Sequence, residues 1–147
     1  MTRPDLIGRA LVAAQFALLA WLIWPLTPQH WSPTALALVS GSAVLALWTL
    51  FHNRPGNFNI RPEPKASGRL VTGGPYRFMR NPMYSTLLLF AAAEVAAYGD
   101  MRKLACWIAL ALVLLAKTLL EERSLGARFP DYAAYAKRVR RFIPGVF

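Results

Sequence analysis

Residues 34–51 read TALALVSGSAVLALWTLF, and this stretch decides the fold class of the chain. It contains no Asp, Glu, Lys or Arg. Its length is close to the ~20 residues that an α-helix needs to cross a hydrocarbon core about 30 Å thick. The stretch therefore predicts a transmembrane helix.

Three further apolar blocks have the same character. They cover residues 6–26, 83–98 and 104–120. The block at 83–98 is short for a span and carries Glu94. Short connections at 27–33 and 99–103 predict antiparallel neighbours. We expect an all-α fold: one polytopic membrane helix bundle over residues 1–147, with about four transmembrane helices.

The composition supports lipid as the solvent. Of the 147 residues, 56% are hydrophobic and 16% charged, against ~45–50% and ~25% in soluble domains. The formal net charge is +10. These charges flank apolar blocks and nothing resembles a nucleic-acid-binding module, so membrane lipids with anionic headgroups are the expected partner. The single cysteine, Cys106, excludes a disulfide within the chain, and no metal-ligand cluster is evident. The N-terminus does not resemble a cleavable signal.

The distribution of Lys and Arg predicts the orientation. Basic residues gather in two segments: Arg54, Arg61, Lys65, Arg69, Arg77 and Arg80 in the loop, and Arg123, Arg128, Lys137, Arg138, Arg140 and Arg141 in the tail. By the positive-inside rule, the loop 53–82, the tail 121–147 and both termini face the cytoplasm, as in an inner-membrane protein. Trp21, Trp24 and Trp31 then form an aromatic belt at the outer surface.

Both cytoplasmic segments have a predictable local structure. Residues 53–82 are too rich in Gly and Pro for a long regular helix. The tail from Phe129 predicts a short amphipathic helix. Pro130 suits its first turn, Asp131 suits its positive end, and Tyr132 and Tyr135 share a face.

Two clusters could carry chemistry. Residues 73–84 read GGPYRFMRNPMY, where glycines allow close approach of a ligand and Arg77 and Arg80 offer planar donors to a carboxylate or phosphate. Residues 117–123 read KTLLEER, where Glu121 and Glu122 end an apolar run although a helix C-terminus prefers cations. Residues 73–84 could instead be only a basic flank with a turn, and residues 117–123 only an interfacial ion-pair network. Both clusters lie at the same depth, which favours a shared cytoplasmic site.

Two other polar residues have simpler explanations. Glu94 lies toward the outer leaflet, where Arg102 and Lys103 are near enough to pair with it. We expect this interaction to be structural. His52, at the inner end of its span, is expected to be a polar interfacial residue.

The two clusters resemble a known pattern. Residues 74–84, GPYRFMRNPMY, are similar to the Gly-Pro-Tyr-Arg-x-x-Arg-His-Pro-x-Tyr-x-Gly signature of the isoprenylcysteine carboxyl methyltransferase and phospholipid methyltransferase superfamily. Glu121-Glu122, the segment 129–135 (FPDYAAY) and Arg138-Val139 follow in that family's order. Asn81 stands where the family most often has His, Thr86 replaces a Gly and Pro130 replaces another. The resemblance covers residues 53–144.

This resemblance implies S-adenosylmethionine-dependent methyl transfer to a lipid-like or hydrophobic acceptor. Glu121, Glu122 and Arg80 would be the catalytic group. The residues implied in cofactor binding are Gly74, Tyr76, Arg77, Arg80, Asn81, Pro82, Tyr84, Glu121, Glu122, Tyr132 and Tyr135. The tail helix would fold back as a lid. No metal and no partner protein are implied.

Two alternatives stay open at this point. A membrane reductase of the steroid-reductase type shares a related late motif and a Tyr-rich tail, but uses NADPH. Such reductases usually carry an Asn before the motif's Tyr, where this chain has Met83. A non-enzymatic membrane scaffold would explain the spans and charges, but not two separated motifs.

Overall fold

The computed structural model describes residues 3–24, 31–53 and 70–147. These residues form α1 (Arg3–Ile23), α2 (Pro33–His52), the 3-10 helix η1 (Gly74–Arg77), α3 (Pro82–Tyr98), α4 (Met101–Arg128) and α5 (Tyr132–Arg138). Within them there is no strand, and a single pair, Met79 and Arg140, forms an isolated parallel bridge. The prediction of an all-α membrane bundle is confirmed. The expected loop cations at positions 54, 61, 65 and 69, and the end of the first predicted span at 25–26, lie outside the described residues.

The apolar blocks become helices close to their predicted bounds. Three helical segments in the described part of the chain are long and apolar enough to cross a membrane: Leu6–Ile23, Pro33–His52 and Met101–Arg128. The remaining predicted span, at residues 83–98, is α3, whose 17 residues cover about 25 Å at about 1.5 Å each. It is therefore shorter than a hydrocarbon core of ~30 Å, as its sequence indicated.

Helix α4 is longer than predicted. It has 28 residues and extends about 42 Å. Residues 121–128, expected in the tail, continue this helix, since six of the eight are Glu, Arg, Leu or Ala, which outweigh Ser124 and Gly126. The predicted tail helix follows as α5, which begins after Asp131 rather than at Pro130.

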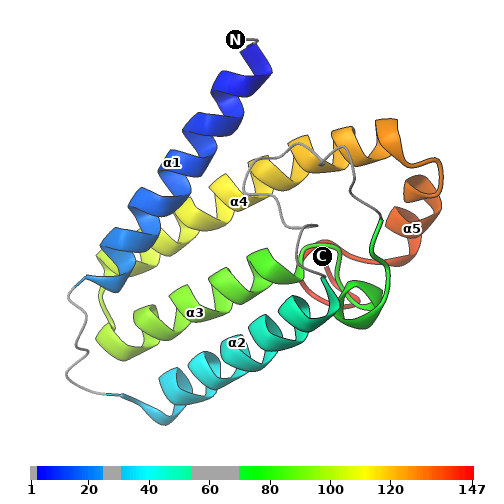
Figure 1. Ribbon diagram of the computed structural model, residues 1–147. Helices are drawn as coiled ribbons and strands as arrows, with labels where there is room; N and C mark the ends of the chain where they lie inside the picture. Colours follow the sequence, from blue (N-terminus) through cyan, green and yellow to red (C-terminus); the bar gives the residue numbers. More distant parts are fainter. Residues whose placement is uncertain (1–2, 25–30, 54–69) are drawn as a thin grey trace.

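Helix α3 lies at the centre of the bundle. Helix α2 packs along one side of it, α4 lies on the other, and α1 packs mainly on α4 (Figure 1). Leu22, Ala91, Leu110 and Leu114 form the apolar core between α1, α3 and α4. The buried positions of α2 are Ala35, Ser42 and Thr49, which recur every second turn and give one narrow face toward α3. The rest of α2 is free to face lipid.

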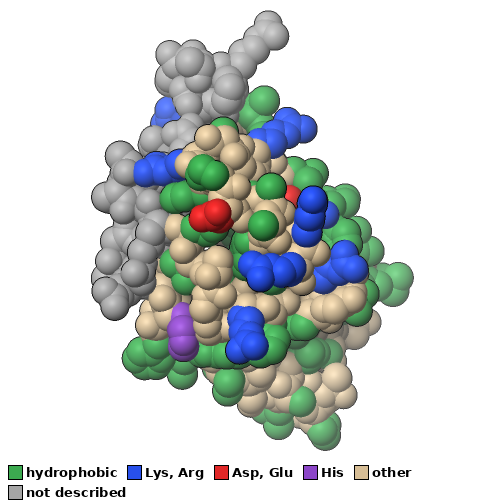
Figure 2. All heavy atoms as spheres, turned by 90° about the vertical axis from the view of Figure 1, so that its right-hand side faces the viewer, with side chains coloured by type: hydrophobic (Ala, Val, Ile, Leu, Met, Phe, Trp, Pro, Cys, Tyr) green, Lys and Arg blue, Asp and Glu red, His purple; other side chains and the backbone are tan. Residues whose placement is uncertain are grey.

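The two ends of the bundle differ in content. The hairpin end comprises the α3–α4 turn, with Glu94, Tyr98 and Lys103, and the last carbonyls of α1. Trp21, Trp24 and Trp31 are exposed near this end, where an aromatic belt was predicted. The basic end comprises η1, the start of α3, the end of α4, α5 and residues 139–147, and Lys and Arg side chains gather on its surface (Figure 2).

At the hairpin end, a lysine fastens α1 to the α3–α4 hairpin. Lys103 Nζ donates to the main-chain oxygens of Leu22 (2.5 Å) and Trp24 (3.2 Å). It also lies 3.7 Å from Glu94 Oε2 and 3.8 Å from the centroid of the Tyr98 ring. These contacts agree with the expected pairing of Glu94 with Lys103, and the structural role of Glu94 stays a prediction. Arg102, the other residue expected to pair with Glu94, is 82% exposed and pairs instead with Asp100, the N-cap of α4.

Candidate active site at the basic end

The site starts from two Pro-initiated helices that share a short connection. Pro75 opens η1 and Pro82 opens α3, both at first-turn positions where the missing N–H costs nothing. Gly74 has φ +56°, and a Cβ built there would lie 2.2 Å from His52 Cδ2. The glycine is therefore required both by its backbone conformation and by the close approach of α2.

Arg80 connects three parts of the basic end. Its Nε and Nη2 donate to Glu122 Oε1 at 2.9 and 2.5 Å. Its Nη1 donates to the carbonyls of Ala136 (2.7 Å) and Val139. The Arg80 side chain is 8% exposed. Its guanidinium is thus committed to the protein's own carboxylate and to the C-terminal end of α5.

Glu122 is held by a second arginine. Arg141 Nη2 and Nε donate to Glu122 Oε2 at 3.0 and 3.1 Å, and Nε also lies 3.2 Å from Oε1. Both oxygens of Glu122 therefore accept charge-assisted hydrogen bonds. The two arginines thus hold this side chain between the start of α3 and the C-terminal segment.

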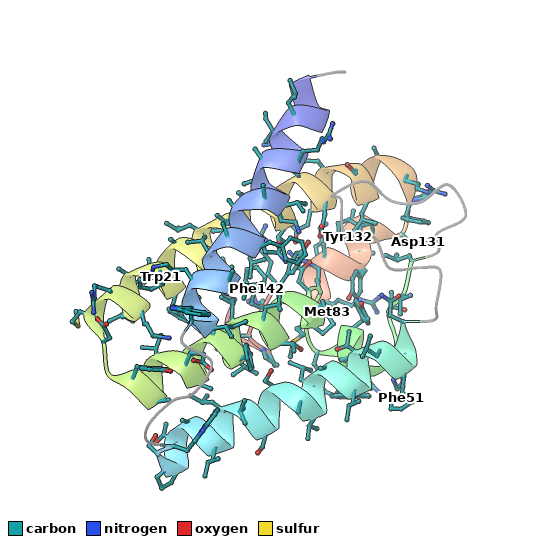
Figure 3. The ribbon with its side chains drawn as sticks, turned by 60° about the vertical axis from the view of Figure 1, so that its left-hand side comes forward. Trp21, Phe51, Met83, Asp131, Tyr132 and Phe142 are labelled. Atoms are coloured by element: carbon teal, nitrogen blue, oxygen red, sulfur yellow. The ribbon has the colours of Figure 1, made fainter. Side chains whose placement is uncertain are left out.

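Further bonds hold the C-terminal segment against η1 and α3. Tyr135 Oη donates to the Tyr76 carbonyl at 2.6 Å, and Ser85 Oγ donates to the Phe142 carbonyl at 2.8 Å. The main-chain N–H groups of Arg80 and Asn81 donate to the carbonyls of residues 140 and 141. Figure 3 shows Met83, Tyr132 and Phe142 gathered from α3, α5 and this segment, away from Trp21. The segment after α4 thus folds back over the motif residues.

Glu121 has different surroundings from its neighbour. Its Oε1 accepts a hydrogen bond from Tyr84 Oη across the α3–α4 interface. Tyr76 is close enough for the Glu121 charge to act on it: burial first, and then this charge, raise the pKa of Tyr76 to about 12. Burial, with the Glu122 charge, likewise raises the pKa of Tyr132 to about 12. At neutral pH both phenols therefore stay protonated.

Asn81 carries a buried polar atom with no partner among the described residues. Its main-chain oxygen accepts from the N–H groups of Tyr84 and Ser85 and so begins α3. Its side chain makes no capping bond, and its buried Nδ2 has no acceptor in the described part of the chain. A buried donor without an acceptor is costly, so this atom needs an explanation, and a bound ligand is one that its position at the motif allows.

Most of the predicted site residues meet here. Gly74 and Tyr76 on η1, Arg80, Asn81, Pro82 and Tyr84 at the start of α3, Glu121 and Glu122 on α4, and Tyr132 and Tyr135 on α5 all belong to the basic end. Arg77 is at the same end but exposed. The first part of the predicted loop, up to residue 69, is not among the described residues.

Some residues of the site were not predicted. Arg141 was counted only as one basic tail residue. His52 was interpreted as interfacial, although it packs on Gly74. Lys117 Nζ donates to Gln15 Oε1 at 2.6 Å, so that α1 also reaches this region. The available signal for the last pair was a lysine and an amide, each inside an apolar block.

Comparison with known proteins assigns the family. Residues 34–131 match the phospholipid methyltransferase family. The chain belongs to this family. The match begins with α2 and includes η1, α3, α4 and the N-cap of α5, so it contains both motifs. Family membership favours a membrane methyltransferase over the reductase and the scaffold.

A curated relative matches about half of the chain. The chain is 33% identical over 82 residues to the cobalt-zinc-cadmium resistance protein CzcN of Cupriavidus metallidurans. The alignment covers 54% of this chain and 38% of CzcN. The chain thus matches well under half the length of this relative.

Proposed function

We propose that the protein transfers a methyl group from S-adenosylmethionine to a lipid-like or hydrophobic acceptor at the cytoplasmic face of the membrane. The proposal combines the family assignment with the geometry of the basic end. The basic surface there suits the cytoplasmic side under the positive-inside rule, as in a bacterial-type inner membrane.

The observation that carries the proposal is the buried Nδ2 of Asn81, which has no acceptor among the described residues. It lies one helical turn from Tyr84, which donates to Glu121. The donor set suits the polar groups of an adenosyl cofactor: an amide donor can bond to a base nitrogen, and a carboxylate can accept from ribose hydroxyls or an ammonium group. The aromatic faces of Tyr76 and Tyr84 suit a sulfonium, since a cation over an aromatic ring gains about 0.5–2 kcal/mol.

Within this proposal, the two carboxylates have separate duties. Glu121 faces the ligands, with Tyr84 orienting it. Glu122 is saturated by Arg80 and Arg141, so these three residues shape the site by holding the C-terminal segment in place. Gly74, Pro82, Tyr132 and Tyr135 form the frame of the cofactor region, and exposed Arg77 is available to the cofactor carboxylate.

The chemistry needs alignment more than a nucleophilic side chain. When bound, S-adenosylmethionine supplies an electrophilic methyl group on a sulfonium. The chain's own residues would align the two ligands and exclude water through the folded-back C-terminal segment. An amine acceptor must also lose a proton, and Glu121 is the carboxylate placed to take it. A carboxylate or thiolate acceptor needs no base.

Ligand binding and methyl transfer test the proposal directly. The protein in lipid nanodiscs is titrated with S-adenosylhomocysteine and, separately, with NADPH. Labelled methyl is then followed from S-adenosylmethionine into the lipid, protein and small-molecule fractions of total membranes. We expect binding of S-adenosylhomocysteine, no binding of NADPH, and label in an apolar fraction. Binding of NADPH alone would support the reductase, and binding of neither would support the scaffold.

Glu121→Gln removes the charge with little change in shape. Because bonds to charged groups are worth about 1.5–3 kcal/mol, cofactor binding or turnover should fall about 10- to 100-fold. Asp131→Asn is the matched control, since Asp131 is exposed and its side chain makes no capping bond. An active Glu121→Gln protein with normal cofactor affinity would exclude the role given to Glu121.

A further inference from the structure

Lys117 is a buried cation within a membrane-crossing helix. It is 2% exposed, and its Nζ donates to Oε1 of Gln15, which is itself 7% exposed. Ionisable side chains at this depth are expensive and usually functional. The lysine has an acceptor on α1, which implies that the first helix is positioned to hold it.

The same ammonium lies against the candidate site. Its Nζ is 5.0 Å from the centroid of the Tyr84 ring. Tyr84 Oη in turn donates to Glu121, which lies one turn beyond Lys117 on the same face of α4. Gln15, Lys117, Tyr84 and Glu121 thus form a continuous series of contacts from α1, α4 and α3.

Helix α1 lies outside the family-matched segment. The match begins at residue 34, whereas Gln15 is in the middle of α1. A helix that served only to anchor the protein in lipid would have no need of a buried amide facing a buried lysine, because apolar residues cost less there. The polar pair points to a role for α1 at the site.

We propose that Lys117, held in place by Gln15, is a positioning residue for the methyl-transfer site. The ammonium supports the Tyr84 ring and holds a counter-charge near Glu121, and α1 is thereby part of the catalytic unit. This inference rests on the proposed function for its kinetic consequences, although the contact itself can be measured without turnover.

A purely structural role makes a different prediction, and the chain contains its own control. Lys103 is also a buried lysine of α4, 4% exposed, and it also bonds to α1, through the carbonyls of Leu22 and Trp24. It belongs to the hairpin end and not to the site. If both lysines only fasten α1 to α4, replacing either should lower the stability of the protein. The kcat and KM of the folded variants should then equal those of the wild type.

The experiment compares Lys117→Met, Lys117→Arg, Gln15→Leu and Lys103→Met in nanodiscs. Gln15→Leu is the mild variant, since leucine suits an apolar span. Two readouts are used: affinity for S-adenosylhomocysteine together with kcat and KM, and the ¹⁹F resonance of 3-fluorotyrosine incorporated at position 84. The second readout needs neither cofactor nor acceptor.

We expect Lys117→Met to lower kcat/KM about 10-fold or more, Gln15→Leu to lower it less, and Lys117→Arg to recover part of the loss. Both Lys117→Met and Gln15→Leu should shift the fluorine resonance, whereas Lys103→Met should leave both readouts as in the wild type. Wild-type behaviour of Gln15→Leu in both readouts, or equal effects of Lys117→Met and Lys103→Met, would overturn the inference. Should the wild type bind no S-adenosylhomocysteine while the resonance still moves, the proposed function fails and the hold of α1 on Tyr84 stands.

Discussion

The hairpin end and the basic end solve the same physical problem with different side chains. Each has a cation with little solvent exposure that pairs with a carboxylate and also donates to two main-chain carbonyls. At the hairpin end these are Lys103, Glu94 and the last carbonyls of α1. At the basic end they are Arg80, Glu122 and the carbonyls at the end of α5. In both places the cation satisfies carbonyls that a helix end leaves without an intrahelical donor.

The difference between the ends indicates where a ligand belongs. The planar guanidinium of Arg80 donates to a carboxylate and two carbonyls at once. Arg141 donates to the second oxygen of Glu122. The ammonium of Lys103 bonds to carbonyls and leaves Glu94 at 3.7 Å. Each end retains a buried atom with no hydrogen-bond partner among the described residues, Asn81 Nδ2 at the basic end and Glu94 Oε2 at the hairpin end. At the hairpin end the ammonium of Lys103 lies 3.7 Å from that oxygen, whereas the amide of Asn81 has no acceptor in the described part of the chain.

The largest loss of stability should come from replacing Arg80. Arg80→Met deprives Glu122 of one partner and the α5 carbonyls of their donor, so we expect a loss of about 3–5 kcal/mol in stability. The C-terminal segment should become sensitive to protease well below the unfolding temperature of the bundle. Thermal unfolding and limited proteolysis in nanodiscs measure both changes. Arg140→Met, at an exposed side chain, is the control, and unchanged protease resistance in Arg80→Met would contradict this reading of the frame.

A smaller loss of stability is expected from a substitution at the hairpin end. Lys103→Met leaves Glu94 buried without a counter-charge, but this carboxyl can take up a proton, so we expect a loss of about 2–3 kcal/mol. Adding Glu94→Gln should restore part of it, because the neutral amide needs no cation. Thermal unfolding of the single and double variants provides the measurement. A double variant no more stable than Lys103→Met would show that Glu94 and Lys103 are not coupled.

The smallest effect concerns the start of α4. Hydrogen bonds from Arg102 lower the pKa of Asp100 below its ordinary value of 3.8. A depressed folded-state pKa means that the ionised carboxylate stabilises the fold above the unfolded-state pKa, and that this contribution is lost as the pH falls through the folded value. Asp100→Asn keeps a good N-cap and loses the charge, so Tm should change by no more than about 2 °C near neutral pH.

The difference between Asp100→Asn and the wild type should also disappear in acid. Unfolding curves at pH 7 and near pH 3 provide the test, with Arg102→Gln as the matched loss of the partner. A Tm difference between Asp100→Asn and the wild type that grows in acid would contradict a stabilising role for the ionised Asp100.

Much of this arrangement could be predicted from the sequence. Apolar blocks of sufficient length fixed the helices, and two motifs at the same depth predicted that η1, α3 and α4 would meet. Arg80 was predicted to bind a carboxylate or phosphate of a ligand, whereas in the structure its partner is Glu122 of the chain itself. Sequence could not indicate this, because either adjacent acid could have faced inward, and the rotation of α4 decides which one does.

Other contacts had no readable signal. The positive-inside bias explains every cation of the tail equally well, and so conceals that Arg141 binds Glu122. Gln15 lies in an apolar block where a single amide looks incidental, until packing of α1 on α4 places it opposite Lys117. The end of α4 was placed too early because hydropathy falls at Glu121, while most of the following residues, apart from Ser124 and Gly126, are good helix formers.

The unequal lengths of α3 and α4 have a consequence for how the protein sits in its membrane. Helix α3 covers about 25 Å and α4 about 42 Å, and they meet in a tight turn at the hairpin end. If that common turn is placed at one edge of a hydrocarbon core of about 30 Å, α3 ends short of the other edge and α4 extends beyond it. The hydrogen-bonded pair Tyr84 and Glu121 then lies at this difference in length. In that placement the acyl-chain length of the surrounding lipid would set how deeply these two residues are immersed.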